Sequence, residues 1–301
     1  MRRVAAWCGL LGALSGVVAC GGGTQQASSS PAPSSSAVAP AVAPAPGKHQ
    51  LTLEHGGATR KYRLHAPDGY DPARPVPLVI AMHPYPGNGS AMIELAGLDE
   101  VAARENFLVA YPDGIAGGFN ALICCGKADD VGFLTALTEH LVADWRVDPD
   151  RVYLTGISNG GDMSFRAAVE ATGMFAAIGA VSGGFGGALA AKPDYVPKSP
   201  VSVITFIGDQ DRYAQTFRSG IQTWQQRLRC TPVKPAPKSP AETIVLTRTR
   251  CADGSEVEVY VIEGMGHSWP GAKTGGLAAP DAGVVATELV WKFFAAHPRK
   301  R

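Results

Sequence analysis

The feature that most constrains the fold is a regular alternation of strand-like and helix-like segments across residues 51–296. The strand-like segments are rich in β-branched and apolar residues, and amphipathic segments lie between them. Two strand-like runs, 77–82 and 201–207, are so apolar that each is typical of a parallel strand covered on both faces. The repeated strand–helix–strand pattern therefore predicts a single α/β domain with a doubly wound, mostly parallel sheet flanked by helices on both faces.

The alternation gives a specific expectation for each element. We expect strands at 51–53, 60–65, 77–83, 107–111, 151–157, 176–181, 201–208, 243–248 and 256–263. We expect helices at 92–106, 130–144, 160–171, 213–228 and 284–296, with Asp129 or Asp130 as the N-cap of the second. The charge balance of 27 basic and 26 acidic residues leaves no basic surface, so we expect no nucleic acid among the partners.

The first residues resemble an export signal. Arg2 and Arg3 precede an uncharged apolar run, 4–19, which is short for a membrane span of about 20 residues. The run ends in Val-Val-Ala-Cys-Gly, a sequence similar to the lipobox of bacterial lipoproteins, so Cys20 is a candidate for lipidation. An ordinary signal peptide with a chance cysteine at its end is the alternative interpretation.

The composition after Cys20 predicts a spacer between this signal and the folded part. Every residue from 27 to 46 is Ala, Ser, Pro or Val, which gives too little bulk to pack. We therefore expect a signal peptide at 1–19, a disordered tether at 20–48 and the folded domain at 49–298. The protein would be exported and held at the cell envelope only through a lipid anchor, or otherwise secreted.

The cysteines agree with an oxidising compartment. Beyond Cys20 there are four of them, an even number: Cys124, Cys125, Cys230 and Cys251. We favour a disulfide between Cys230 and Cys251, which bracket a Pro-rich segment, and Cys124 and Cys125 would pair with each other or stay free. A metal site is disfavoured because no histidine lies near either group at ligand spacing.

The candidate nucleophile is Ser158, in the sequence Gly-Ile-Ser-Asn-Gly at 156–160. A strand-like segment precedes this G-x-S-x-G motif and a helical one follows it, which is the context of a nucleophile elbow. The turn is so tight that a Cβ atom at either flanking glycine would clash, and it leaves the serine hydroxyl at the carboxyl edge of the sheet beside a helix N-terminus.

The partners of Ser158 are expected in the chain order serine, acid, histidine. Beyond Ser158 the histidines are His267, in a loop after an expected strand, and His297, which we interpret as a solvated tail residue. The acid should follow a buried strand, and the loop after 201–207 contains both Asp209 and Asp211. Whichever of the two is not catalytic would be a turn or capping residue.

An oxyanion hole needs two backbone N–H groups near the nucleophile. One is expected from Asn159, directly after Ser158, and the other from the loop after the strand 77–83. Proline has no N–H group, so the second donor must be His83, Tyr85 or Gly87, of which Tyr85 is best placed.

Several motifs together resemble those of the secreted polyhydroxybutyrate depolymerase and feruloyl esterase group of the α/β-hydrolase superfamily. They are Met-His-Pro-Tyr-Pro-Gly-Asn-Gly at 82–89, Cys-Cys at 124–125, Asp-Asp-Val-Gly-Phe-Leu at 129–134, the segment 148–161 around Ser158, and Gly-His-Ser-Trp-Pro-Gly at 266–271. The family's acid loop reads His-Gly-x-x-Asp, which aligns Asp211 with the acid. Pro84 and Ile207 depart from the family's usual Gly and His, which puts substrate preference in doubt.

The resemblance implies an exported serine esterase that acts through an acyl-enzyme, with Ser158, Asp211 and His267 as its triad and without metal or cofactor. Its substrates would be esters of the polyhydroxybutyrate-oligomer, feruloyl or acetyl-polysaccharide type. A peptidase of the same fold and a non-catalytic, polymer-binding surface lipoprotein are the alternatives.

Overall fold

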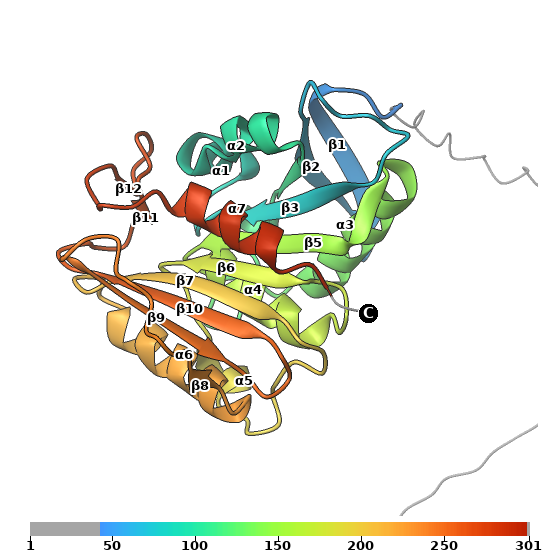
Figure 1. Cartoon of the computed structure of the whole chain (residues 1–301). Helices are drawn as coiled ribbons and strands as arrows, with labels where there is room; N and C mark the ends of the chain where they lie inside the picture. The colour runs from blue at the N-terminus through green and yellow to red at the C-terminus, as the bar shows by residue number, and fades with distance from the viewer. Residues whose placement is uncertain (1–42, 300–301) are drawn as a thin grey trace, which may run out of the picture. The chain divides into compact units, whose positions relative to one another are not determined.

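A ten-stranded sheet forms the centre of the molecule, in the order β1–β2–β4–β3–β5–β6–β7–β10–β9–β8 (Figure 1). The computed structural model describes residues 43–299. The strands of this sheet are β1 (Gly47–His55), β2 (Ala58–Ala66), β3 (Val76–Met82), β4 (Leu108–Pro112), β5 (Val147–Ile157), β6 (Ala177–Val181), β7 (Ser202–Gly208), β8 (Thr231–Pro232), β9 (Ile244–Arg250) and β10 (Glu256–Ile262).

Most of the sheet is parallel. The six neighbouring strands from β4 to β10 run in one direction, whereas β1 and β2 at one edge and β9 and β8 at the other pair antiparallel with their neighbours. Every residue of β3 and β7 is buried, as their apolar runs predict. The predicted doubly wound α/β fold is therefore confirmed.

Helices cover both faces of the sheet, and each face has its own apolar core. One face packs against α1 (Gly89–Ala96), α2 (Leu98–Glu105) and α7 (Ala286–Ala296), and Figure 1 shows α7 crossing the sheet. The other face packs against α3 (Asp130–Asp144), α4 (Asn159–Glu170) and α6 (Ala214–Arg227). The ring of Phe107 stacks on Trp291 in the first core, and Phe165 meets Trp224 edge-on in the second.

The expected helix 92–106 is wrong, because the structure divides it into α1 and α2. Gly97 has a φ of 60°, and its N–H group donates to the Ile93 carbonyl, which closes α1. Both helices bury their apolar sides against the same face of the sheet, so one continuous apolar pattern conceals the break. The helix expected at 130–144 coincides with α3, and its N-cap is Asp129, whose carboxylate accepts from the Gly132 N–H group.

Several short elements have no counterpart in the sequence-based expectations. They are η1 (Ile115–Gly117), α5 (Gly187–Ala190), β8 and the separate pair β11 (Trp269–Pro270) and β12 (Ala278–Ala279). The two helical segments span about one turn each and the strands only two residues each, so none of them carries a periodic signal.

The first described strand, β1, starts at Gly47, within the last residues of the expected tether, and pairs with β2 along its whole length. The expected signal peptide, Cys20 and most of the expected tether lie outside the described residues. Within residues 43–299, no helix is both long enough and apolar enough to cross a bilayer.

Two disulfides stabilise loops of the domain. Cys230, just after α6, is bonded to Cys251, just after β9, which is the pairing that the sequence favours. Cys124 is bonded to its neighbour Cys125 in the loop between η1 and α3, which is one of the two outcomes that the sequence leaves open.

Candidate active site

Ser158 lies on a sharp turn between β5 and α4. Its φ of 56° and ψ of −120° are unusual for a residue with a side chain. The glycines on either side are required by packing: a Cβ atom on Gly156 would lie 2.5 Å from the Gly160 carbonyl carbon, and one on Gly160 would lie 2.2 Å from the Met82 carbonyl oxygen. The turn therefore has the geometry of a nucleophile elbow.

Asp211 and His267 are bonded to each other beside this turn. The distance between Asp211 Oδ2 and His267 Nδ1 is 2.7 Å, and the Asp211 side chain is fully buried while that of His267 is 23% exposed. The Tyr213 N–H group donates to Asp211 Oδ1 at 2.9 Å and holds the carboxylate from its other side. Because a carboxylate accepts hydrogen bonds, Nδ1 carries a proton and Nε2 is left free to accept one.

Asp209 has a different partner. Its Oδ1 accepts the Gly264 N–H group at 2.8 Å, and its own N–H group donates to the Ile262 carbonyl. These two bonds join the loop after β7 to the loop after β10. The loops approach so closely that a Cβ atom on Gly208 would lie 2.1 Å from the Met265 carbonyl oxygen. Asp209 is therefore a turn residue in this structure.

Hydrogen bonds at the end of β6 connect the histidine loop to the serine turn. The Ser158 N–H group donates to the Val181 carbonyl at 2.9 Å. The next residue, Ser182, accepts the Ser268 N–H group and donates to the Ser268 carbonyl through its hydroxyl. Ser268 directly follows His267 in the chain, so the end of β6 is hydrogen-bonded both to the turn of Ser158 and to the loop of His267.

A pocket of about 210 Å³ opens at Ser158. Its apolar wall consists of Tyr85, Ile123, Tyr213 and Phe217 together with the disulfide-bonded Cys124 and Cys125. The rings of Tyr213 and Phe217 lie 5.9 and 6.4 Å from the His267 ring, so the histidine packs beside two of the pocket's lining side chains. Ser158, Asn159, Asp162 and Arg212 complete the lining.

Asn159 is the first residue of α4, so its N–H group lies in the helical turn that has no intrahelical acceptors. Its side chain has a second role that the sequence does not reveal. Oδ1 accepts the Phe119 N–H group at 2.8 Å, and Nδ2 donates to the carbonyls of Phe119 and Cys124. The residue after the candidate nucleophile therefore fixes the loop that contains the Cys124–Cys125 disulfide.

The structure narrows the choice of the second oxyanion donor. The Gly87 N–H group already donates to the Gly117 carbonyl at 3.0 Å, which removes it as a donor to a substrate. The His83 ring is buried, where its Nε2 accepts the Gly114 N–H group and its Nδ1 contacts the Pro84 carbonyl. Burial lowers the pKa of His83, so the ring stays neutral in this structural role. These contacts involve the ring and leave the main-chain N–H groups of His83 and Tyr85 as candidate donors, and of these two residues Tyr85 lines the pocket.

Asp162 lines the pocket, which the sequence analysis did not predict. It lies one helical turn after Ser158 on α4 and is buried. Its Oδ1 accepts the Gly184 N–H group at 2.8 Å. Burial raises the pKa of Asp162 to about 8, outweighing that hydrogen bond, which lowers it. The position four residues after the serine is the only signal in the sequence that could have pointed to it.

The comparisons with known proteins agree with this geometry. Residues 60–195 match a family model described as Esterase PHB depolymerase. Feruloyl esterase C of Emericella nidulans is 33% identical over 131 residues, which are 42% of this chain and 47% of that protein. Feruloyl esterase B of Piromyces equi is 26% identical over 237 residues, which are 72% of this chain and 44% of that protein.

A solved structure with the same arrangement of elements is the acetyl xylan esterase from Aspergillus awamori. It superposes with a TM-score of 0.59 and 16% identity over 73% of this chain and 94% of that one. The chain has the α/β-hydrolase fold, and residues 60–195 are similar to the Esterase PHB depolymerase family. This α/β-hydrolase spans less than half the length of the two feruloyl esterases, so their names identify relatives and not its own substrate.

The family match covers only part of the candidate site. It ends at residue 195 and so contains Tyr85, Ser158 and Asn159 but neither Asp211 nor His267. The assignment of the acid and the histidine in this α/β-hydrolase therefore depends on the bond between them and on their place beside Ser158. Within the described residues, no group of three or more His, Cys, Asp or Glu side chains could hold a metal ion.

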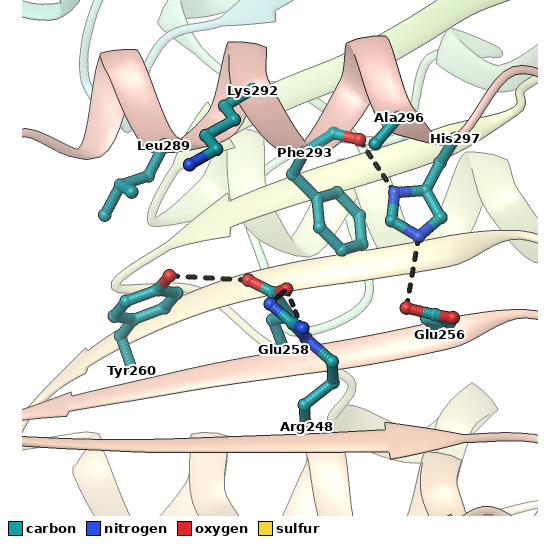
Figure 2. Close-up of a pocket in the computed structure, with 9 residues that line it drawn as sticks. All are labelled: Arg248, Glu256, Glu258, Tyr260, Leu289, Lys292, Phe293, Ala296 and His297. Carbon is teal, nitrogen blue, oxygen red and sulfur yellow. Dashed lines mark hydrogen bonds and ion pairs between the residues drawn. The ribbon is translucent and has the colours of Figure 1, made fainter. Parts of the chain in front are cut away.

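A second and larger hollow, of about 380 Å³, lies between α7 and the strands β9 and β10 (Figure 2). Its lining comes from β9, β10 and α7 and shares no residue with the Ser158 pocket. The two hollows are therefore separate. Figure 2 shows Glu258 between Arg248 and the Tyr260 hydroxyl, so this carboxylate is satisfied within the hollow's own wall.

His297 belongs to this second hollow and not to the candidate active site. Its Nδ1 is 2.7 Å from the Phe293 carbonyl oxygen, and its Nε2 is 3.4 Å from Glu256 Oε2 (Figure 2). Its ring also stacks on Phe293. The expectation of a solvated tail residue is wrong, because His297 is the C-cap of α7 and packs back against the start of β10.

Proposed function

We propose that this α/β-hydrolase cleaves carboxylic esters through a covalent acyl-enzyme on Ser158. The observation that carries the proposal is the 2.7 Å bond from His267 Nδ1 to Asp211, in a histidine that packs beside two side chains of the pocket where Ser158 lies on an elbow turn. The names of the relatives, feruloyl esterase and acetyl xylan esterase, support an ester as the scissile group.

Each residue of the proposed triad has a defined task. His267 Nε2 takes the Ser158 hydroxyl proton as the oxygen attacks the ester carbonyl, and Asp211 stabilises the resulting imidazolium. The carbonyl oxygen becomes an oxyanion, which the N–H groups of Asn159 and Tyr85 would stabilise. His267 then protonates the leaving alcohol, and a water activated in the same way hydrolyses the acyl-enzyme. These steps require neither metal nor cofactor.

The substrate class that fits best is an ester of an oligomer or a polysaccharide, of the polyhydroxybutyrate, feruloyl or acetyl type. The pocket is bordered by Tyr85, Ile123 and Tyr213, which are 51%, 40% and 40% exposed although they are large and apolar. Exposed apolar side chains around a reactive serine favour a substrate that extends beyond the pocket.

The test of the proposed function uses purified protein, a p-nitrophenyl ester and the matching p-nitroanilide. We expect turnover of the ester, little turnover of the anilide, and a stoichiometric adduct on Ser158 with a fluorophosphonate probe, seen by mass spectrometry. Ser158→Ala should lose turnover and labelling while it remains folded by circular dichroism. Preferred cleavage of the anilide would indicate a peptidase, and a folded protein that neither turns over nor labels would indicate a binding protein.

We further propose that the protein is exported and anchored through a lipid on Cys20. The charged start, the apolar run and the lipobox-like sequence before Cys20 support this proposal, as do the disulfides in the described domain. Cys20→Ala should move the protein from the membrane fraction to the soluble extracytoplasmic fraction and change its processed mass. Wild-type protein that is found in the culture supernatant with another N-terminal residue would contradict the anchor.

A further inference from the structure

Arg212 is the one cationic side chain in the lining of the Ser158 pocket. It follows Asp211 directly and is exposed at the pocket's border. Among the ion pairs of residues 43–299, none involves Arg212. Most other arginines of the domain have a carboxylate partner, so a cation without one beside a reactive serine requires an explanation.

The guanidinium of Arg212 packs on the ring of Tyr213, another residue of the pocket's lining. Its central carbon lies 4.7 Å from the centre of the Tyr213 ring, a distance at which a cation–π contact restrains it. The Tyr213 ring in turn lies 5.9 Å from the His267 ring. One aromatic side chain therefore connects Arg212 to the proposed general base.

The pocket's only carboxyl side chain, on Asp162, does not offset this charge. Asp162 is buried, its Oδ1 accepts the Gly184 N–H group, and burial favours its neutral form by raising its pKa. The remaining lining side chains are aromatic, aliphatic, hydroxyl, amide or disulfide groups. The pocket consequently carries one positive charge and no fixed negative charge.

We propose that Arg212 selects esters that carry a carboxylate, on either the acyl or the alcohol side of the scissile bond. This inference rests on the proposed esterase function and adds a specificity-determining residue to it. A guanidinium donates two parallel hydrogen bonds to a carboxylate, which fixes the orientation of the substrate as well as attracting it. Dicarboxylic acid monoesters and hydroxybutyrate oligomers with a free carboxyl end have this chemistry, whereas neutral aryl or acetyl esters do not, so the inference narrows the proposed substrate class to its anionic members.

The test compares esters that differ in one carboxylate. On the acyl side the pair is mono-4-nitrophenyl adipate and 4-nitrophenyl hexanoate, and on the alcohol side it is 4-butanoyloxybenzoate and its methyl ester. For each pair the selectivity is the ratio of kcat/KM for the anionic ester to that for the neutral one. In Arg212→Gln we expect the selectivity to fall by about five- to tenfold in at least one pair, the effect of a charge-assisted hydrogen bond at a partly exposed site.

Two further variants separate recognition from a general effect of charge. Arg212→Lys keeps the charge without the planar fork and should give an intermediate selectivity. Arg218→Gln removes a cation from α6 that does not line the pocket, and it should leave the selectivity within about twofold of wild type. Added salt should lower the selectivity of wild type and leave that of Arg212→Gln almost unchanged.

The outcomes distinguish this inference from the proposed function. If wild type hydrolyses the neutral esters but its selectivity is the same in Arg212→Gln for both pairs, the inference is wrong and the esterase function stands. Equal losses in Arg212→Gln and Arg218→Gln would also overturn it, because the effect would then belong to the overall charge. If wild type hydrolyses none of the four esters and Ser158 takes no fluorophosphonate, the proposed function is wrong and the inference with it.

Discussion

At the residue scale, two acids only two positions apart have separate partners. Asp211 bonds the His267 ring from a fully buried side chain, whereas Asp209 bonds a backbone N–H group of the histidine loop. The two residues differ in position. Asp209 directly follows β7 and faces the loop after β10, whereas Asp211 lies two residues further along the chain. A catalytic and a structural role can therefore be tested independently in one short loop.

The first prediction concerns these two acids. Asp211→Asn should lower kcat by about 10³–10⁴ with little change in KM, because the amide no longer stabilises the imidazolium or fixes its tautomer. Asp209→Asn should keep kcat within a few-fold of wild type and lower the free energy of unfolding by about 1 kcal/mol. Steady-state kinetics and urea unfolding of both variants measure this, and the reverse pattern would assign the acid to Asp209.

The second prediction concerns Asp162 and pH. The folded protein holds this proton up to a pKa of about 8, whereas the ordinary value is 3.8. Between these values the folded state binds more protons than the unfolded state, so this group's stabilising contribution is complete below about pH 4 and is lost as pH rises toward 8. In Asp162→Asn that loss is absent. Urea unfolding at pH 5, 7 and 8.5 should therefore show the variant gaining stability relative to wild type as pH rises, and parallel pH profiles would refute a buried, protonated Asp162.

At the scale of elements, a buried ion pair connects β2, α3 and the loop that contains the Cys124–Cys125 disulfide. Arg60 on β2 bonds Asp130 Oδ1 at the start of α3 at 2.6 Å, and the two side chains are 2% and 1% exposed. Asp130 Oδ2 accepts the Asn120 N–H group, in the loop that the Asn159 side chain holds from the other end. The loop with the Cys124–Cys125 disulfide is therefore held both by the buried ion pair and by the side chain of Asn159.

The third prediction tests this connection. Asp130→Ala should lower the free energy of unfolding by about 3–5 kcal/mol, because it leaves the Arg60 guanidinium buried without its counter-charge. Asp129→Ala is the matched control, since it removes an exposed N-cap from the same helix and should cost only about 1 kcal/mol. Chemical denaturation of the two variants measures the difference. Equal losses would show that the buried pair contributes no more than the cap.

At the scale of the whole molecule, the order of strands in the sheet brings the proposed catalytic groups together. β7 and β10 are paired in parallel although α6, β8 and β9 lie between them in the chain. The loops that follow these two strands consequently meet at one edge of the sheet, and β6 beside them supports the turn of Ser158. The second hollow, between α7 and the strands β9 and β10, shares no lining residue with the Ser158 pocket.

The sequence by itself determined the features that depend on local pattern. The apolar periods of 2 and 3.6 residues predicted the α/β class and the extent of α3, and the paired glycines around Ser158 predicted the elbow. Even Cys230 with Cys251 could be favoured, because their segment is short and self-contained. These features depend on residues that are close together in the chain. Bond lengths and backbone sterics restrict the geometry that such residues can adopt.

Only the tertiary structure decided which distant groups meet. Asp211 and His267 are 56 residues apart in the chain, and residue patterns alone left Asp209 as an equal candidate. The use of the Gly87 N–H group by another loop, the burial of Asp162 and the break between α1 and α2 at Gly97 also depend on packing across the sheet. The physical reason is that hydrogen-bond partners and burial are set by the atoms that surround a group in space, and the order of the strands fixes which atoms those are.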